Sequence, residues 1–165
     1  MHHQVALNVS SLLFMTPLGL SMAVTIRVGN AVGRNSEIDT RRAGMIGILL
    51  IFIIQIFIAS FIFIFPEMVA KIYTDDTKVQ LIAVQLLFLA AIFQMSDGIQ
   101  VAAAGALRGI KDTTFLMYST TIAFWLFGFA ASWWFCFKEN MGAQGLWIGL
   151  IFGLTVAAVL NFLRF

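Results

Sequence analysis

Residues 43–66 read AGMIGILLIFIIQIFIASFIFIFP, and this stretch decides the fold of the chain. It contains no Asp, Glu, Lys or Arg. An α-helix rises about 1.5 Å per residue, so roughly 20 residues cross a hydrocarbon core of about 30 Å. No polar face repeats along the stretch at helical spacing, as it would on a helix at the surface of a soluble domain. The stretch therefore predicts a transmembrane helix.

Four more stretches are similarly long and apolar. The predicted spans are residues 5–26, 79–107, 113–137 and 142–163, which together with residues 43–66 make five. Asp97 is the one charged residue inside them. The strands of a β-barrel are short alternating segments, so apolar blocks of this length argue against a barrel. The sequence predicts an all-α, polytopic membrane protein with five transmembrane helices in a single unit over residues 1–165.

The composition excludes several classes of protein. Of the 165 residues, 61% are hydrophobic and 11% are charged, whereas soluble domains contain about 45–50% and about 25%. An ordinary soluble enzyme and a disordered chain are therefore excluded. A nucleic-acid-binding module is excluded because the net charge is only +2 and the basic residues are scattered. Cys136 is the single cysteine, which rules out an internal disulfide and a cysteine-rich metal site.

The basic residues gather at alternate connections. Residues 27–42, residues 108–112 and the C-terminal end carry seven of the ten, and the opposite connections carry three. The positive-inside rule therefore predicts a cytoplasmic C-terminus and, for five spans, an N-terminus outside. The seven are Arg27, Arg34, Arg41, Arg42, Arg108, Lys111 and Arg164, and the three are Lys71, Lys78 and Lys138. Residues 1–4 lack the positive n-region of a signal peptide, so we expect the chain to be the end of a longer protein.

Asp97 is the leading functional candidate. It lies 11 residues before Arg108, which is about 16 Å along a helix and near mid-membrane. Carboxylates inside a membrane are expensive and often mark ion paths. The alternative is a neutral Asp97 hydrogen-bonded to a neighbouring helix. Phe93, Gln94 and Gln100 share the same face by helical spacing; each glutamine either surrounds a cation or pairs across helices, and the sequence favours neither.

Other features have plainer interpretations. Pro17 is either a hinge or a packing kink, and packing is slightly favoured. Gly145, Gly149 and Gly153 recur every four residues, which favours close helix packing. No nucleophile has a plausible base nearby, so we expect neither an enzyme nor a cofactor. The tryptophans fit interfacial belts or an apolar cavity, with lipid-facing packing as the default; they are Trp125, Trp133, Trp134 and Trp147.

Four stretches of the chain carry a family resemblance. Phe93-Gln94-Met95-Ser96-Asp97, running on to Gly105-Ala106-Leu107-Arg108-Gly109 and Lys111-Asp112-Thr113, is the most specific. The others are residues 3–8 with Ser10-Ser11, residues 25–29, and Met141-Gly142 leading to residues 145–149. With these motifs the chain resembles the C-terminal part of the multidrug and toxic compound extrusion (MATE) family, in its bacterial cation-coupled branch. Members have twelve helices in two lobes, and the five spans here correspond to the last five.

The resemblance also implies roles for individual residues. Asp97 matches the carboxylate that binds the coupling ion, either Na⁺ or H⁺. Gln4 and Asp76 match polar positions of the drug cavity, although Asp75 and Asp76 also fit a solvated loop. Relatives often have tyrosine at the positions of Phe14 and Phe93, so hydroxyl ligands are absent there. Gln94 and Gln100 complete the expected cavity.

The leading interpretation is therefore one part of a secondary transporter. The whole protein would exchange external Na⁺ or H⁺ for cationic, amphipathic drug-like molecules across the bacterial inner membrane. Its expected partners are the lipid bilayer, these molecules, and either the missing N-terminal lobe or a second copy, with no nucleic acid. The seventh helix, which in this branch supplies a partner glutamate, is missing from the 165 residues. The alternative is a non-transporting membrane fragment or an assembly subunit that docks on a partner lobe.

Overall fold

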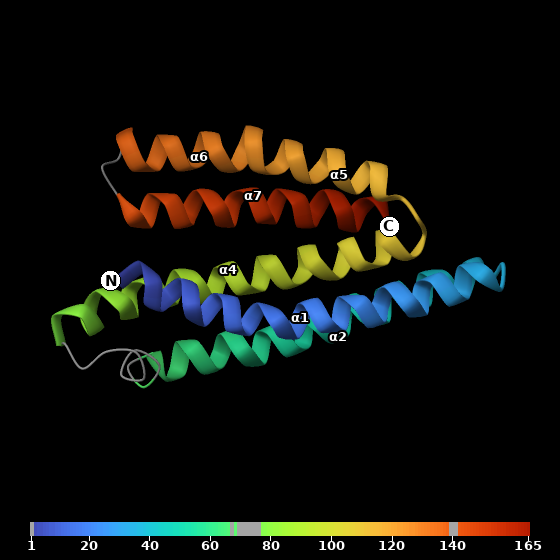
Figure 1. Ribbon diagram of the computed structural model, residues 1–165, viewed down its shortest axis with the longest axis horizontal. Coiled ribbons are helices and arrows are strands. Elements are labelled where there is room, and N and C mark those ends of the chain that lie inside the picture. The colour runs from blue at the N-terminus through green and yellow to red at the C-terminus, as the bar shows by residue number, and fades with distance from the viewer. Residues whose placement is uncertain (1, 67, 69–76, 139–141) are drawn as a thin grey trace.

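The computed structural model describes residues 2–66, 68, 77–138 and 142–165, and over these residues the chain is built from long helices that run up and down (Figure 1). The described part contains no strand, so the predicted all-α fold is confirmed. The long helices are α1 (His2–Gly33), α2 (Glu37–Ile64), α4 (Thr77–Gly109) and α7 (Ala143–Arg164). Between α4 and α7, α5 (Thr113–Ile122), the π-helical η1 (Ala123–Gly128), α6 (Phe129–Trp133) and the π-helical η2 (Trp134–Lys138) follow one another without a break.

Four helical stretches of the described chain are long and apolar enough to cross a membrane. They are Glu37–Ile64, Leu87–Gly109, Thr113–Lys138 and Gln144–Arg164. They correspond to four of the five predicted spans. The fifth predicted span, residues 5–26, lies within α1, and its place in the membrane stays a prediction.

The polar connection expected at residues 27–42 is shorter than the sequence suggested. The α1 helix continues to Gly33 and α2 already begins at Glu37. Asn35 adopts a left-handed φ of 54°, which asparagine tolerates better than most residues. The Ser36 hydroxyl accepts a hydrogen bond from the Asp39 N–H at 3.3 Å and caps α2. A turn of three residues, 34–36, therefore replaces the predicted loop. The cap at Ser36 allows α2 to begin directly after this turn.

The turns after α1 and α4 and the C-terminus lie at one end of the molecule, and the N-terminus lies at the other (Figure 1). The shared end carries all seven basic residues of the predicted cytoplasmic side, and we call it the basic end. The alternation of connections that the sequence predicted is therefore present in the fold.

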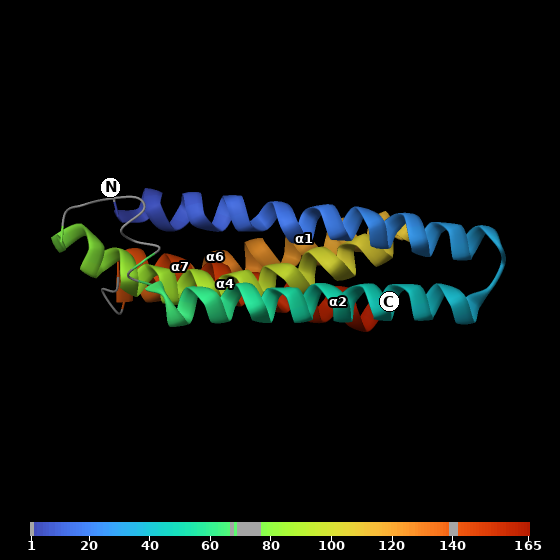
Figure 2. The same ribbon diagram turned by 90° about the horizontal axis from the view of Figure 1, so that it is seen from below.

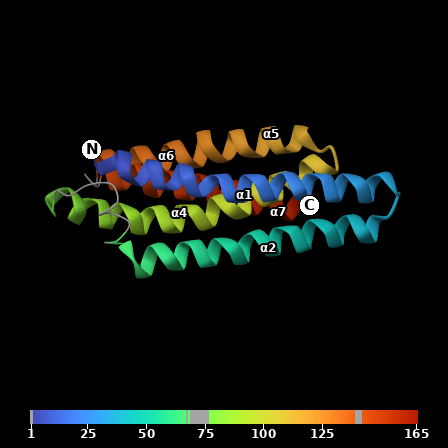
Figure 3. The same cartoon turned by 60° about the horizontal axis from the view of Figure 1, so that its bottom comes forward.

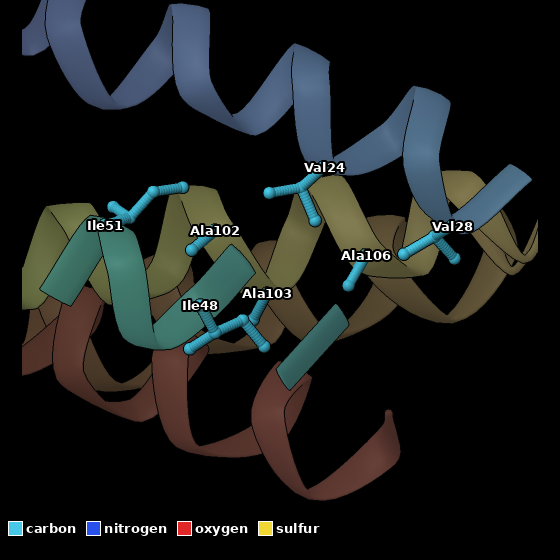
Figure 4. Close-up of a cluster of buried hydrophobic side chains, with 7 residues drawn as sticks. All are labelled: Val24, Val28, Ile48, Ile51, Ala102, Ala103 and Ala106. Carbon is cyan, nitrogen blue, oxygen red and sulfur yellow. The ribbon is translucent and has the colours of Figure 1, made fainter. Parts of the chain in front are cut away.

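Helix α4 is the centre of the bundle and packs against α1, α2 and α7 (Figures 2 and 3). Its C-terminal half is rich in alanine, so three helices approach it closely. Figure 4 shows the resulting cluster, in which side chains from α1 and α2 meet the alanines of α4. Its members are Val24, Val28, Ile48, Ile51, Ala102, Ala103 and Ala106.

Helix α7 packs against the helix of residues 113–138 through its glycines. A Cβ at Gly145 would lie 2.8 Å from the Cys136 nitrogen, and a Cβ at Gly153 would lie 3.0 Å from the Gly128 Cα. A Cβ at Gly149 would overlap Ser132. The period-four glycines therefore serve close packing, as their spacing indicates.

Candidate functional site

Asp97 lies near the middle of the candidate span Leu87–Gly109 and is only 6% exposed. Its Oδ2 atom is buried and has no hydrogen-bond partner among the described residues. An ionised carboxylate at the centre of a membrane costs at least about 2.5 kcal/mol even on the most lenient scale. Within the described residues, Oδ2 therefore does not make the hydrogen bond to a neighbouring helix that the sequence left open as an alternative, and the role of Asp97 stays a prediction.

Gln94 lies one helical turn before Asp97 on α4. Its side chain is fully buried, and neither its amide oxygen nor its amide nitrogen has a hydrogen-bond partner among the described residues. Buried polar groups in proteins are nearly always hydrogen-bonded, so an unpaired amide beside an unpaired carboxylate requires an explanation. Gln100, which was expected on the same face, is only half-buried. The structure thus brings Gln94 into the interior with Asp97 and leaves Gln100 at its margin.

A third polar side chain, Gln55 of α2, reaches the same turn of α4. Gln55 is fully buried, and in the part of the chain that the structure describes neither its amide oxygen nor its amide nitrogen has a hydrogen-bond partner. A Cβ at Gly98, the residue after Asp97, would overlap the Gln55 side chain. Glycine at this position therefore makes room for Gln55 beside Asp97. Sequence reasoning missed Gln55. The available signal was an amide in the middle of residues 43–66, which are otherwise almost wholly apolar.

The α1 side of α4 is also polar. Thr25 Oγ1 lies 3.0 Å from the Ser21 carbonyl oxygen and 2.8 Å from the Gly105 carbonyl oxygen, to either of which it donates. The Ser21 hydroxyl is buried and unpaired, and a Cβ at Gly105 would lie 2.7 Å from the Ser21 carbonyl oxygen. Pro17 is buried one turn earlier and has no N–H to close the helix there. Polar atoms of α1 therefore continue the polar face of α4 towards the basic end.

The remaining predicted cavity residues are placed as follows. Phe93 is half-buried and packs edge-to-face against Trp147 of α7, with ring centroids 5.5 Å apart. Trp147 is only 2% exposed, so the default expectation of a lipid-facing surface is wrong for this tryptophan, whose ring packs against α4. Phe14 is half-buried on α1. The Gln4 side chain and Asp76 lie outside the described residues.

The other tryptophans are exposed, and their expected position at lipid stays a prediction. Trp125, Trp133 and Trp134 are exposed on the helix of residues 113–138. This helix packs mainly against α7 and leaves its outer face free of protein contacts within the described chain. Large exposed aromatic side chains on that face suit a lipid environment.

The donor atoms at this site suit a hard cation or a proton. Asp97 offers a carboxylate, and Gln55 and Gln94 each offer an amide oxygen, which are the ligand types of alkali and alkaline-earth ions. No three of His, Cys, Asp and Glu come together in the described part of the chain, so these residues do not form a transition-metal cluster there. The three side chains therefore place one carboxylate and two amide oxygens, all of them hard oxygen donors, at one level of the bundle.

The sequence and the fold have counterparts in known proteins. A family model described as MatE matches residues 2–134. The chain belongs to the MatE family. The resemblance inferred from the motifs around Asp97 is therefore confirmed.

Relatives of this MatE chain include bacterial proteins named for drug resistance. It is 44% identical over 163 residues to the "Probable multidrug resistance protein NorM" of Xanthomonas campestris pv. campestris. It is 42% identical over 168 residues to the "Multidrug resistance protein NorM" of Photobacterium profundum. These alignments cover 99% and 98% of the chain, and in both cases 36% of the relative. The chain thus spans about a third of the length of these relatives.

Solved structures show the same arrangement of helices. The crystal structure of the eukaryotic MATE transporter AtDTX14 superposes with a TM-score of 0.92 at 25% identity, covering 98% of this chain and 36% of that one. An outward-facing MATE family transporter superposes with a TM-score of 0.88 at 22% identity, covering 99% and 37%. The chain is therefore a multi-pass membrane protein with the fold of one part of a MATE transporter.

Proposed function

We propose that this chain is part of a secondary active multidrug efflux transporter, which exchanges Na⁺ or H⁺ for cationic, amphipathic compounds. The observation that carries the proposal is the buried carboxylate of Asp97 with the unpaired amides of Gln55 and Gln94 around it. The names of the NorM relatives support drug efflux as the overall activity.

Competition at Asp97 would couple the two fluxes. A cation bound at the carboxylate, with amide oxygens of Gln55 and Gln94 in reach, neutralises the buried charge, and so does a proton. A cationic drug satisfies the same carboxylate, so drug and coupling ion exclude one another. Each therefore leaves when the other arrives from the opposite side, which is the requirement for exchange.

The remaining parts of the transporter would lie outside these 165 residues. Alternating access needs one bundle to move against another around a central site. The rest of the whole protein would supply the second lobe and a glutamate partner for Asp97. Gln4, Phe14 and Asp76 would line the drug cavity with Phe93 and Gln100.

The basic end would face the cytoplasm of a bacterial inner membrane. Its seven basic residues against three on the other side support this orientation. On a background with Cys136 replaced, an impermeant thiol reagent added to intact cells should label a cysteine at position 138 and not one at position 34. The reverse pattern would invert the topology.

The coupling role is tested in the full-length transporter that contains this chain. Asp97→Asn keeps the size of the side chain and removes its titratable charge, so ion-driven drug efflux should be lost while the protein still reaches the membrane. Asp39→Asn is the matched control, because Asp39 is exposed in the first turn of α2. Efflux should be measured in proteoliposomes with an imposed Na⁺ or H⁺ gradient, which also separates the two ions. Wild-type efflux by Asp97→Asn would show that Asp97 is only structural.

A further inference from the structure

The basic end contains a cavity of about 840 Å³ between the α1–α2 hairpin and the last turn of α7. The Phe165 ring occupies the space that a Cβ at Gly44 would take, so α7 packs closely against α2 at this level. The charged lining residues of the cavity are Glu37, Arg41 and Arg164.

An apolar groove continues from this cavity along the bundle. It has a volume of about 440 Å³ and lies between α2 and α7, with Ile99 of α4 in its lining. Met45, Phe162 and Leu163 line both the cavity and the groove, so the two spaces meet. Apart from Ser96 and Thr155, whose hydroxyls lie 3.0 Å apart, the groove residues are apolar. One continuous surface is therefore charged at the end of the bundle and apolar along its side.

The arginines of the cavity retain donors for a ligand. Arg164 donates from Nε to Asp112 Oδ2 at 2.8 Å, and its two terminal nitrogens carry four more N–H groups. Arg41 forms no ion pair within the described chain. The negative charge of Glu37 in the same cavity disfavours an anion there. The basic end as a whole nevertheless has seven basic residues and only three acidic ones. The acidic residues are Glu37, Asp39 and Asp112.

We propose that this surface binds one anionic phospholipid, with its phosphate at Arg41 and Arg164 and an acyl chain in the groove between α2 and α7. Guanidinium groups bind phosphate oxygens through paired, charge-assisted hydrogen bonds. Basic pockets between transmembrane helices are suited to anionic headgroups. The groove runs parallel to the helices, which is the direction of an acyl chain in a bilayer. A soluble phosphate would not use the groove, and a zwitterionic ethanolamine headgroup would instead place its ammonium at Glu37.

The test measures lipid retention by the full-length transporter in detergent. Native mass spectrometry would follow the tightest bound lipid after exposure to equal amounts of phosphatidylglycerol, phosphatidylethanolamine and phosphatidylcholine. Phosphatidylglycerol should be retained preferentially, and Arg41→Gln should lower its retention about tenfold, the loss expected for charge-assisted hydrogen bonds. Arg42→Gln is the matched control, since it removes the same charge from the next residue, which does not line the cavity. It should change retention by less than about twofold.

Two further arms separate the alternatives. Glu37→Gln should leave phosphatidylglycerol retention unchanged or raise it, because it removes a repulsive charge. A preference for phosphatidylethanolamine that Glu37→Gln abolishes would overturn the proposal in favour of a zwitterionic lipid.

Displacement of the bound lipid by millimolar inorganic phosphate would overturn the proposal in favour of a free-phosphate site. Equal losses for Arg41→Gln and Arg42→Gln would show diffuse attraction only. Size-exclusion profiles matching the wild type would establish that the exposed-arginine variants remain folded.

Discussion

Two helix contacts in this MatE chain depend on glycine, and they differ in what lies opposite the glycines. On α7, Gly153 faces the backbone of the helix of residues 113–138, and Gly149 faces the backbone and the hydroxyl of Ser132 on the same helix. On α4, Gly98 faces the amide side chain of Gln55, and Gly105 faces Ser21. Both Gln55 and Ser21 are buried and carry side-chain atoms with no partner.

The difference shows that glycine spacing alone indicates only a close approach of helices. At the α7 contact two backbones meet, and the gain is van der Waals packing. At Gly105 the nearest atom is the backbone carbonyl oxygen of Ser21, whereas at Gly98, next to Asp97, the space is given to the Gln55 amide, which has no partner in the described protein. Such groups lower stability unless something else pairs with them. We therefore interpret the first contact as structural and the Gly98–Gln55 contact as part of the site proposed above.

The largest effect on stability should come from the α7 contact. In Gly149→Ala, the added Cβ would overlap the nitrogen and hydroxyl of Ser132, and a backbone cannot move aside cheaply. We expect a loss of about 1–3 kcal/mol, the usual result of overpacking. The measurement is the thermal stability of the full-length protein in detergent. Gly19→Ala is the control, because a Cβ there would meet nothing within 4 Å. Equal stability of the two variants would show that the contact is looser than described.

A smaller change of opposite sign should follow when Gln55 becomes apolar. Gln55→Leu keeps a similar volume and removes a buried, unpaired amide, so stability should stay level or rise by about 1 kcal/mol. Ion-driven efflux should nevertheless fall, because an oxygen ligand near Asp97 is lost. Ser60→Ala, an exposed change on the same helix, should alter neither quantity. A variant that loses stability and keeps full efflux would place Gln55 among the packing residues.

Much of this architecture was predictable from the sequence. Long charge-free blocks such as residues 43–66 indicate the helices, and the basic residues at alternate connections give their up-and-down order. Asp97 was found because a charge in an apolar block is conspicuous. These signals depend on composition along the chain, which the sequence shows directly.

Features that depend on which face of a helix meets a neighbour were not predictable. Residues 43–66 have no polar stripe, so nothing in them indicated that Gln55 points towards Gly98. The same uncertainty explains Trp147, whose buried ring packs against α4. The π-helical segments at Ala123–Gly128 and Trp134–Lys138 also escaped prediction, because a shift in helix register leaves no mark on an apolar sequence.

The smallest stability effect, and the sharpest test of the comparison, is expected at Gly98. In Gly98→Ala the added Cβ would overlap the Gln55 side chain, which can rotate away, whereas a Cβ at Gly149 would also overlap the backbone nitrogen and Cα of Ser132. Helix propensity gained by alanine partly offsets the contact, so stability should change by less than about 1 kcal/mol. The displaced Gln55 should weaken ion coupling, seen as a severalfold higher ion concentration for half-maximal efflux. Melting as low as that of Gly149→Ala, with unchanged ion dependence, would mean that both glycine contacts serve packing and that Gln55 is no part of the site.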